Sequence, residues 1–252
     1  MTDKEKSLFL ELTPDFPPVA VKFCFSRPEG VPRSEKKQAL CTFVREAQVC
    51  GRKFYIDAEN EDCVGKVVLG MADFPGFEGS GTVGCDFGVF RTQAANAVLY
   101  HKITLLKRGS HNYIIFAPLS DCDFEPDLLF LLTDVKQTDV IIRANGYFSG
   151  DLWESRDSYV VGCAWQFAYP FVSGKINHSM TGTHHGQNRR KPYPEGLTLI
   201  TIPFQKLPEV TRALEEMDRV PIAFREDAES RGELDRRRQR WAEMSCEGPL
   251  VK

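Results

Sequence analysis

Three cysteines lie in short segments that suit the binding of a soft metal or cluster. Cys41 lies in an amphipathic segment, Cys63 lies in a turn that contains glycine, and Cys163 directly follows a glycine. Thiolates are the usual protein ligands of iron–sulfur clusters and of other soft metals. We therefore predict that Cys41, Cys63 and Cys163 hold a metal or an iron–sulfur cluster, with Cys85 as a fourth candidate ligand.

The spacing of the cysteines leaves other interpretations open. No two of them form a C-x-x-C pair, so ligands would have to converge from distant segments. Free cysteine is also among the most commonly buried residue types, which makes simple core packing the alternative, and a reactive thiol is a third. Cys24, Cys122 and Cys246 have no convergent partner in the sequence, and we interpret them as structural.

The turn-rich segment 178–191 combines glycines with histidines and basic residues. Backbone amides with Arg and Lys form a workable cradle for phosphate or carboxylate, and imidazole is a common metal ligand. We select Arg189, His184 and His185 as candidate anion- or substrate-binding residues. The alternative is a solvated basic turn.

Three carboxylates, Glu59, Glu61 and Asp62, precede Cys63. Clustered carboxylates can transfer protons or bind a hard cation, whereas on an exposed turn they are simply solvated. Glu59 and Cys63 are the candidate catalytic residues. They do not specify a reaction, so the sequence leaves open whether the protein is an enzyme.

The periodicity of apolar residues predicts the elements that must position these groups. In the first half we expect a strand at 17–25, a helix at 35–49 capped by Ser34, strands at 53–57 and 67–71, a mobile or ligand-covering glycine-rich loop at 73–88, a helix at 89–98, and strands at 101–107 and 112–117. In the second half we expect a strand at 125–133, a helix at 135–147, an amphipathic segment from Cys163 to Gly174, a strand at 196–203 and a helix at 207–217.

The second half repeats the plan of the first. The cysteine-bearing segments after Cys41 and Cys163 are similar, which predicts half-repeats at about 14–72 and 123–204. We expect an α+β fold in which two similar mixed units form one domain over residues 1–217. A charged helical extension is expected over 218–252, because residues 224–244 are over half charged.

Composition excludes several classes of function. The chain has 252 residues, 42% of them hydrophobic, and a formal charge of -3, which is typical of a soluble globular protein without a nucleic-acid partner. No signal peptide or membrane span is recognisable. We expect a cytoplasmic protein that does not bind membranes, whose partner is a small molecule or a redox protein.

Three separated blocks carry a resemblance to a known family. The segments P17-P-V-A-V-K-F23, A58-E-N-E-D-C-V-G65 and G162-C to Arg189 resemble the prokaryotic family called domain of unknown function 169, over most of residues 8–217. The resemblance implies a shared fold and shared polar positions, including Glu59 and Arg189, without a settled activity. The chain departs from the family pattern at Cys63-Val-Gly65-Lys66 and at Thr183-His-His, which bears on the ligand set.

Three hypotheses follow. The first is a cytoplasmic metal or iron–sulfur protein of redox or sulfur metabolism, with an open position that faces Arg189. The second is a non-enzymatic ligand- or cofactor-binding module with structural cysteines, in which the glycine-rich segment forms a lid over a pocket lined by Phe74, Phe77 and Phe87. The third is a thiol enzyme that uses Cys63 near Glu59.

Overall fold

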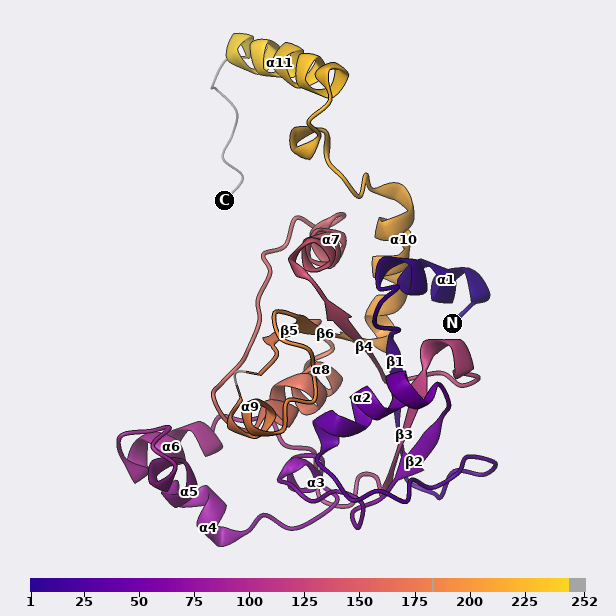
Figure 1. The fold of residues 1–252 in the computed structure, drawn as a ribbon. Coiled ribbons are helices and arrows are strands. Elements are labelled where there is room, and N and C mark those ends of the chain that lie inside the picture. Colours follow the sequence, from indigo (N-terminus) through magenta and orange to yellow (C-terminus); the bar gives the residue numbers. More distant parts are fainter. Residues whose placement is uncertain (183, 245–252) are drawn as a thin grey trace.

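The protein is an α+β structure built on one six-stranded antiparallel sheet (Figure 1). The computed structural model describes residues 1–182 and 184–244. The strand order is β2-β3-β1-β4-β6-β5. The strands are β1 (Val19–Cys24), β2 (Phe54–Ile56), β3 (Tyr113–Pro118), β4 (Leu128–Thr133), β5 (Asn177–Met180) and β6 (Thr198–Pro203).

Both faces of the sheet are buried, which explains the almost continuous apolar runs of its strands. Every residue of β4 is buried. Val21 and Phe130 belong to the core cluster on one face, whereas Ala20 and Leu129 belong to the cluster on the other. Because side chains alternate along a strand, a run that is apolar at every position supplies two cores at once.

Helices cover the two faces separately. The face that carries Val21 is covered by α2 (Leu40–Cys50), by the π-helical turn η2 (Ala164–Ala168) and by α8 (Tyr169–Ser173). The opposite face is covered by α1 (Asp3–Leu12), α7 (Val135–Gly146) and α10 (Leu207–Glu216). The short turns η1 (Leu119–Asp121) and η3 (Phe204–Lys206) follow β3 and β6.

The two halves of the sheet have the same arrangement. From the edges inward the strands read β2-β3-β1 and β5-β6-β4, so the first strand of each half is innermost and the second is at the edge. β1 and β4 pair with each other at the centre. In each half a helix ends at a left-handed glycine, Gly51 or Gly174, both with φ of 66°, before the edge strand begins.

The helix expected at 35–49 begins later than the sequence indicates. Its N-cap is Ala39, and the Glu61 side chain accepts a hydrogen bond from the Leu40 amide at 3.1 Å. Ser34 instead accepts a bond from the Lys36 amide. The expected cap was therefore wrong, because a distant carboxylate satisfies the helix start that a local serine was predicted to satisfy.

Two expected strands are absent among the described residues. Segment 67–71, predicted as a strand, lies in and after the short helix α3 (Gly65–Val68), and segment 101–107 is a turn and an irregular stretch. Elements that were not predicted are also present, among them α1 and the edge strand β5. Short apolar runs have no reliable period, which is why both predictions at 67–71 and 101–107 were wrong.

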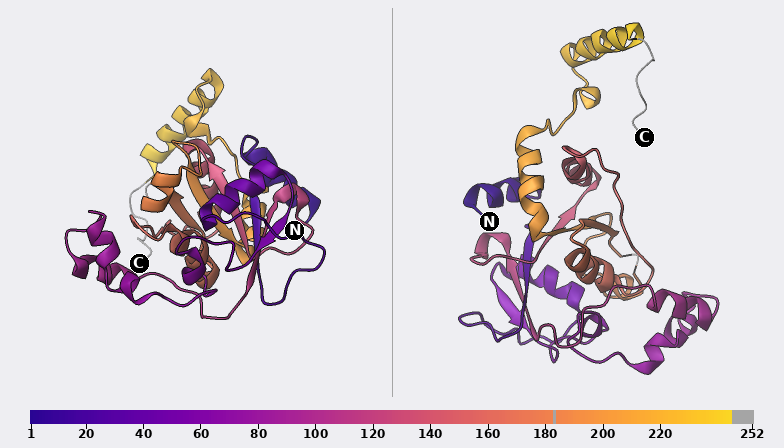
Figure 2. Two further views of the ribbon diagram at one scale, coloured as in Figure 1. Left: turned by 60° about the horizontal axis from the view of Figure 1, so that its bottom comes forward. Right: turned by 180° about the vertical axis from the view of Figure 1, so that it is seen from behind.

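The glycine-rich segment contains regular structure, contrary to the expected loop. It forms α4 (Gly76–Gly79) and α5 (Thr82–Asp86), followed by α6 (Gln93–Tyr100), and this group projects from one side of the sheet (Figure 2). Gly81 has φ of 82°, and a Cβ there would lie 2.1 Å from the Gln93 carbonyl oxygen. Glycine at this position therefore permits α5 and α6 to pack closely.

The chain continues past α10 through η4 (Ile222–Phe224) to the long helix α11 (Ala228–Glu243), which stands away from the sheet (Figure 1). Glu233 forms ion pairs with Arg236 and Arg237 along its surface. Cys246 lies outside the described residues. Among the helices that the structure describes, none combines the length and the apolar character needed to cross a membrane.

His111, just before β3, is a buried histidine that should make stability depend on pH. The residue is 3% exposed, and burial lowers its pKa to about 4. The folded protein therefore binds fewer protons than the unfolded chain between the ordinary histidine pKa and about pH 4, so stability falls as the pH falls through this window. Between pH 7 and 4.5 the His111→Gln variant should lose about 2 kcal/mol less stability than the wild type.

Urea denaturation at the two pH values measures this difference. The exposed His101→Gln variant is the control for replacing a histidine by glutamine. An unchanged pH dependence in the His111→Gln variant would contradict the prediction.

Candidate functional site

A cavity of about 430 Å³ lies where the N-terminal ends of four helical segments meet. Its wall contains the first residues of α2 and α3, the start of the helical segment at Gly162, and the first residues of α9 (His185–Arg190). The first amides of a helix have no partner within the helix and carry partial positive charge. Two of these amides, those of Leu40 and Lys66, donate to the buried Glu61 carboxylate at the cavity wall.

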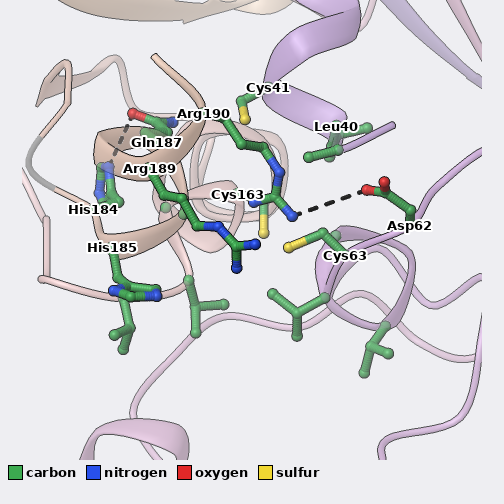
Figure 3. Close-up of a pocket in the computed structure, with 18 of the residues that line it drawn as sticks. Leu40, Cys41, Asp62, Cys63, Cys163, His184, His185, Gln187, Arg189 and Arg190 are labelled. Atoms are coloured by element: carbon green, nitrogen blue, oxygen red, sulfur yellow. Dashed lines mark hydrogen bonds and ion pairs between the residues drawn. The ribbon is translucent and has the colours of Figure 1, made fainter. Parts of the chain in front are cut away.

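Cys41, Cys63 and Cys163 all line this cavity. Cys41 lies in the first turn of α2, Cys63 precedes α3, and Cys163 precedes η2. Figure 3 shows the three sulfur atoms directed toward the same part of the cavity, around the Arg190 guanidinium. Cys85 is not among the lining residues, and its thiol lies 3.9 Å from the Arg91 carbonyl oxygen.

Burial keeps the three thiols protonated. It raises the pKa of Cys41 to about 11 and raises the pKa of Cys63, where the Glu61 carboxylate adds to the effect. Burial also raises the pKa of Cys163, with a further contribution from Cys63. Each thiolate would be disfavoured by the others, so a positively charged group in the cavity is what would stabilise all three.

Two arginines of α9 reach the cavity. The Arg190 guanidinium lies beside Cys63, and its Nη2 atom lies 4.0 Å from Asp62 Oδ1. Burial opposes the charged form of Arg190 whereas its interaction with Cys63 favours it, and the pKa of Arg190 is raised. Arg189 lines the cavity without a hydrogen bond or ion pair to the described part of the chain. The sequence singled out Arg189, and the structure adds Arg190 as the arginine in contact with a cysteine.

His184 and His185 occupy different parts of the wall. His184 is buried, with Nε2 2.5 Å from Asp157 Oδ1 and Nδ1 3.2 Å from Gln187 Oε1. A Cβ on Gly162 would lie 2.7 Å from the His184 ring, so glycine permits this close approach. The His185 ring stacks on Phe87, with centroids 4.7 Å apart. His184 is thus held by protein partners, whereas His185 contacts the ring of Phe87, which also lines the cavity.

The structure distinguishes two carboxylates that the sequence grouped together. Glu59 is exposed, pairs with Arg33 at 3.0 Å and does not line the cavity. Glu61 is 1% exposed and lines the cavity. Its carboxylate accepts hydrogen bonds from the amides of Leu40, Cys63 and Lys66, at 3.1, 3.0 and 3.1 Å.

Glu61 therefore ties the start of α2 to the turn before α3, and so positions two of the three thiols. Burial raises its pKa against the opposing effect of its amide donors. A Cβ on Gly65 would lie 2.9 Å from Glu61 Oε1 and from Leu40 Cβ, which shows how closely the two segments approach.

The glycine-rich segment contributes one side of the cavity. Val83, Gly84 and Phe87, from α5 and its C-terminal cap, are among the lining residues. Of the three phenylalanines proposed to line a pocket, only Phe87 does so; Phe77 is 62% exposed and Phe74 packs on Tyr100. The part of the cavity wall that α5 forms is thus apolar, whereas α2, the turn before α3, and α9 contribute thiols and arginines.

The described donor groups of the cavity do not form a preformed site for a single metal ion. Within residues 1–182 and 184–244, no three His, Cys, Asp or Glu side chains are grouped so that they could hold one ion. Zinc–thiolate bonds of about 2.3 Å require sulfurs about 4 Å apart. The three cysteines share a cavity, but they are not arranged as a ready mononuclear site.

Fold and site together define a class: an antiparallel α+β protein with a cysteine-lined cavity at the meeting point of helix N-termini. The chain belongs to the family described as "Uncharacterised ArCR", domain of unknown function 169, whose model matches residues 8–213. Comparison with curated proteins and with solved structures finds no match.

Proposed function

We propose that the protein is a cytoplasmic iron–sulfur or metal-binding protein of redox or sulfur metabolism, with Cys41, Cys63 and Cys163 as ligands. The observation that carries the proposal is that three thiols from three distant segments face one cavity. Core packing alone does not explain why all three lie at the starts of helical segments. Amides at such positions can donate to cluster sulfurs and stabilise the negative charge of the cluster.

A cluster is favoured over a single ion. Cysteines bound to different irons of one cluster lie farther apart than cysteines bound to one ion, which suits ligands that come from three separate segments. Arg190 beside Cys63 supplies a positive charge that would offset the negative charge of the loaded site. Three cysteine ligands would leave one coordination position without a protein thiolate.

Arg189 indicates which class of ligand the rest of the cavity could bind. A guanidinium without a partner in the described chain is suited to a carboxylate or phosphate. The stacked rings of His185 and Phe87 would bound the same space. We propose a small anionic substrate here, with electrons supplied or removed by a redox partner protein.

We also infer that the two halves of the chain arose by duplication of one strand–helix–strand–strand unit. Glu61 lies ten residues after Gly51, and His184 lies ten residues after Gly174. Cys41 precedes its glycine by ten residues and Cys163 by eleven, and the π-helical turn η2 accounts for the additional residue. The cavity would then lie at the junction of two related units. An experimental structure in which the halves fail to superpose would refute this inference.

The first test is metal analysis of protein purified without air from cells supplied with iron. We expect a brown protein with broad visible absorption that contains iron and acid-labile sulfide, and that bleaches in air. Zinc or nickel without sulfide would support a metal site and contradict the cluster. A colourless, metal-free protein would overturn the proposal and leave the apolar wall at Phe87 as evidence for a ligand-binding module.

A further inference from the structure

The helices α4, α5 and α6 form a small unit of their own beside the cavity, which we call the α4–α6 unit. The three helices pack on one another, and a Cβ on Gly84 would lie 2.5 Å from the Asn96 side chain. The buried Asn96 side chain donates a hydrogen bond to the Gly81 carbonyl oxygen at 2.9 Å, which ties α6 to the start of α5. Packing this close leaves little internal freedom, so any motion of the three helices is a motion of the whole unit.

The two chain segments that connect the α4–α6 unit to the sheet lie side by side. The Leu106 amide donates a hydrogen bond to the Val68 carbonyl oxygen at 2.9 Å. The rings of Phe74 and Tyr100, one from each segment, pack edge to face with centroids 5.8 Å apart. Tyr100 is buried in the core cluster, which fixes the unit at this point. A unit that is attached where its two connections meet can rotate about that attachment.

The α4–α6 unit also contacts α9 through a pair of rings. Phe87, which follows the last residue of α5, stacks on His185 at the start of α9, with centroids 4.7 Å apart and ring planes 15° apart. Phe87 is still 59% exposed, so the contact buries little apolar area. A ring pair of this kind shifts an equilibrium by about 2- to 10-fold. This is enough to favour a closed position of the unit and small enough to permit opening.

We propose that the α4–α6 unit is a lid over the cavity, which pivots where Phe74 meets Tyr100 and is held closed by Phe87 and His185. The part of the cavity wall that α5 forms belongs to this unit, and Cys63 lines the same cavity. Opening of the lid exposes the thiols to molecules in solution, and a ligand that contacts both α5 and α9 favours closure. The inference goes beyond the proposed function and does not depend on it, because closure requires no metal.

The test measures how fast N-ethylmaleimide alkylates Cys63 in the full-length protein after treatment with a chelator, with mass spectrometry to identify each modified cysteine. Cys50 is exposed and does not line the cavity, so its alkylation is the internal reference. In the Phe87→Ala and His185→Ala variants Cys63 should react about 2- to 10-fold faster relative to Cys50, because each variant lacks the ring contact that holds the lid closed. An unchanged rate in both variants would overturn the inference.

The double variant Phe87→Ala/His185→Ala separates a lid from a simple widening of the cavity mouth. If the two rings act through their contact with each other, the double variant should alkylate Cys63 no faster than either single variant. If each ring only blocks the path of the reagent, the two rate increases should multiply, and that result would overturn the inference.

Phe77→Ala is the matched control. Phe77 lies on α4 of the same unit, is 62% exposed and does not line the cavity. In this variant Cys63 should react at the wild-type rate. A rate as high as in the Phe87→Ala variant would mean that loss of any ring loosens the unit, and would overturn the role of the Phe87–His185 contact. None of these rates depends on whether the protein binds iron, so the lid and the proposed function stand or fail separately.

Discussion

Replacing Cys163 by serine should abolish the visible absorption and the bound iron of the anaerobically purified protein. The hydroxyl of serine has nearly the size of the thiol but remains protonated, so it is a poor ligand for a soft metal. Cys41→Ser and Cys63→Ser should have the same effect, because three ligands from three segments act as one unit. Iron and sulfide analysis beside the visible spectrum measures the loss.

Cys85→Ser and Cys122→Ser are the matched controls. Cys85 does not line the cavity, and Cys122 belongs to the core on the opposite face of the sheet. Both variants should retain the iron content of the wild type. An equal loss of iron in the Cys85→Ser variant, or full retention in the Cys163→Ser variant, would contradict the assignment of ligands.

The sequence predicted the elements whose signals are local. β4 and α7 follow one another as an apolar run and a capped amphipathic helix, and both were confirmed nearly to their ends. The start of α2 was not predictable in this way, because its cap is a carboxylate that comes from 21 residues farther along the chain. Tertiary partners of this kind decide element boundaries and leave no trace in a short window of sequence.

In the candidate site too, the sequence predicted what depends on residue type and neighbours, and did not predict what depends on tertiary contacts. The sequence singled out Cys41, Cys63 and Cys163 by residue type and neighbours, and the structure places all three at one cavity. The sequence did not reveal that Arg190 lies beside Cys63, because two adjacent arginines cannot be distinguished until the structure shows which of them lies at the thiol. The order in which segments meet across the sheet, rather than their composition, determines these contacts.

Replacing Glu61 by alanine should destabilise the folded protein by about 3 kcal/mol, because three amides lose their acceptor and each unsatisfied group costs about 1–3 kcal/mol. The start of α2 and the turn before α3 would no longer be tied together. We therefore also expect reduced iron content, although all cysteines remain. Urea denaturation and iron analysis on the same preparation measure both effects.

Glu59→Ala, two residues away, is the control that separates this role from the general charge of the turn. Glu59 is 86% exposed, and removing it should change stability by no more than about 0.5 kcal/mol and leave iron content unchanged. The loss of stability in the Glu61→Gln variant should lie between those of Glu59→Ala and Glu61→Ala. A single amide oxygen can accept from the Leu40 amide or from the other two amides, but not from all three. If Glu59→Ala proved as damaging as Glu61→Ala, the exposed carboxylate would be the functional one, and the bridge between α2 and α3 would not be what positions the thiols.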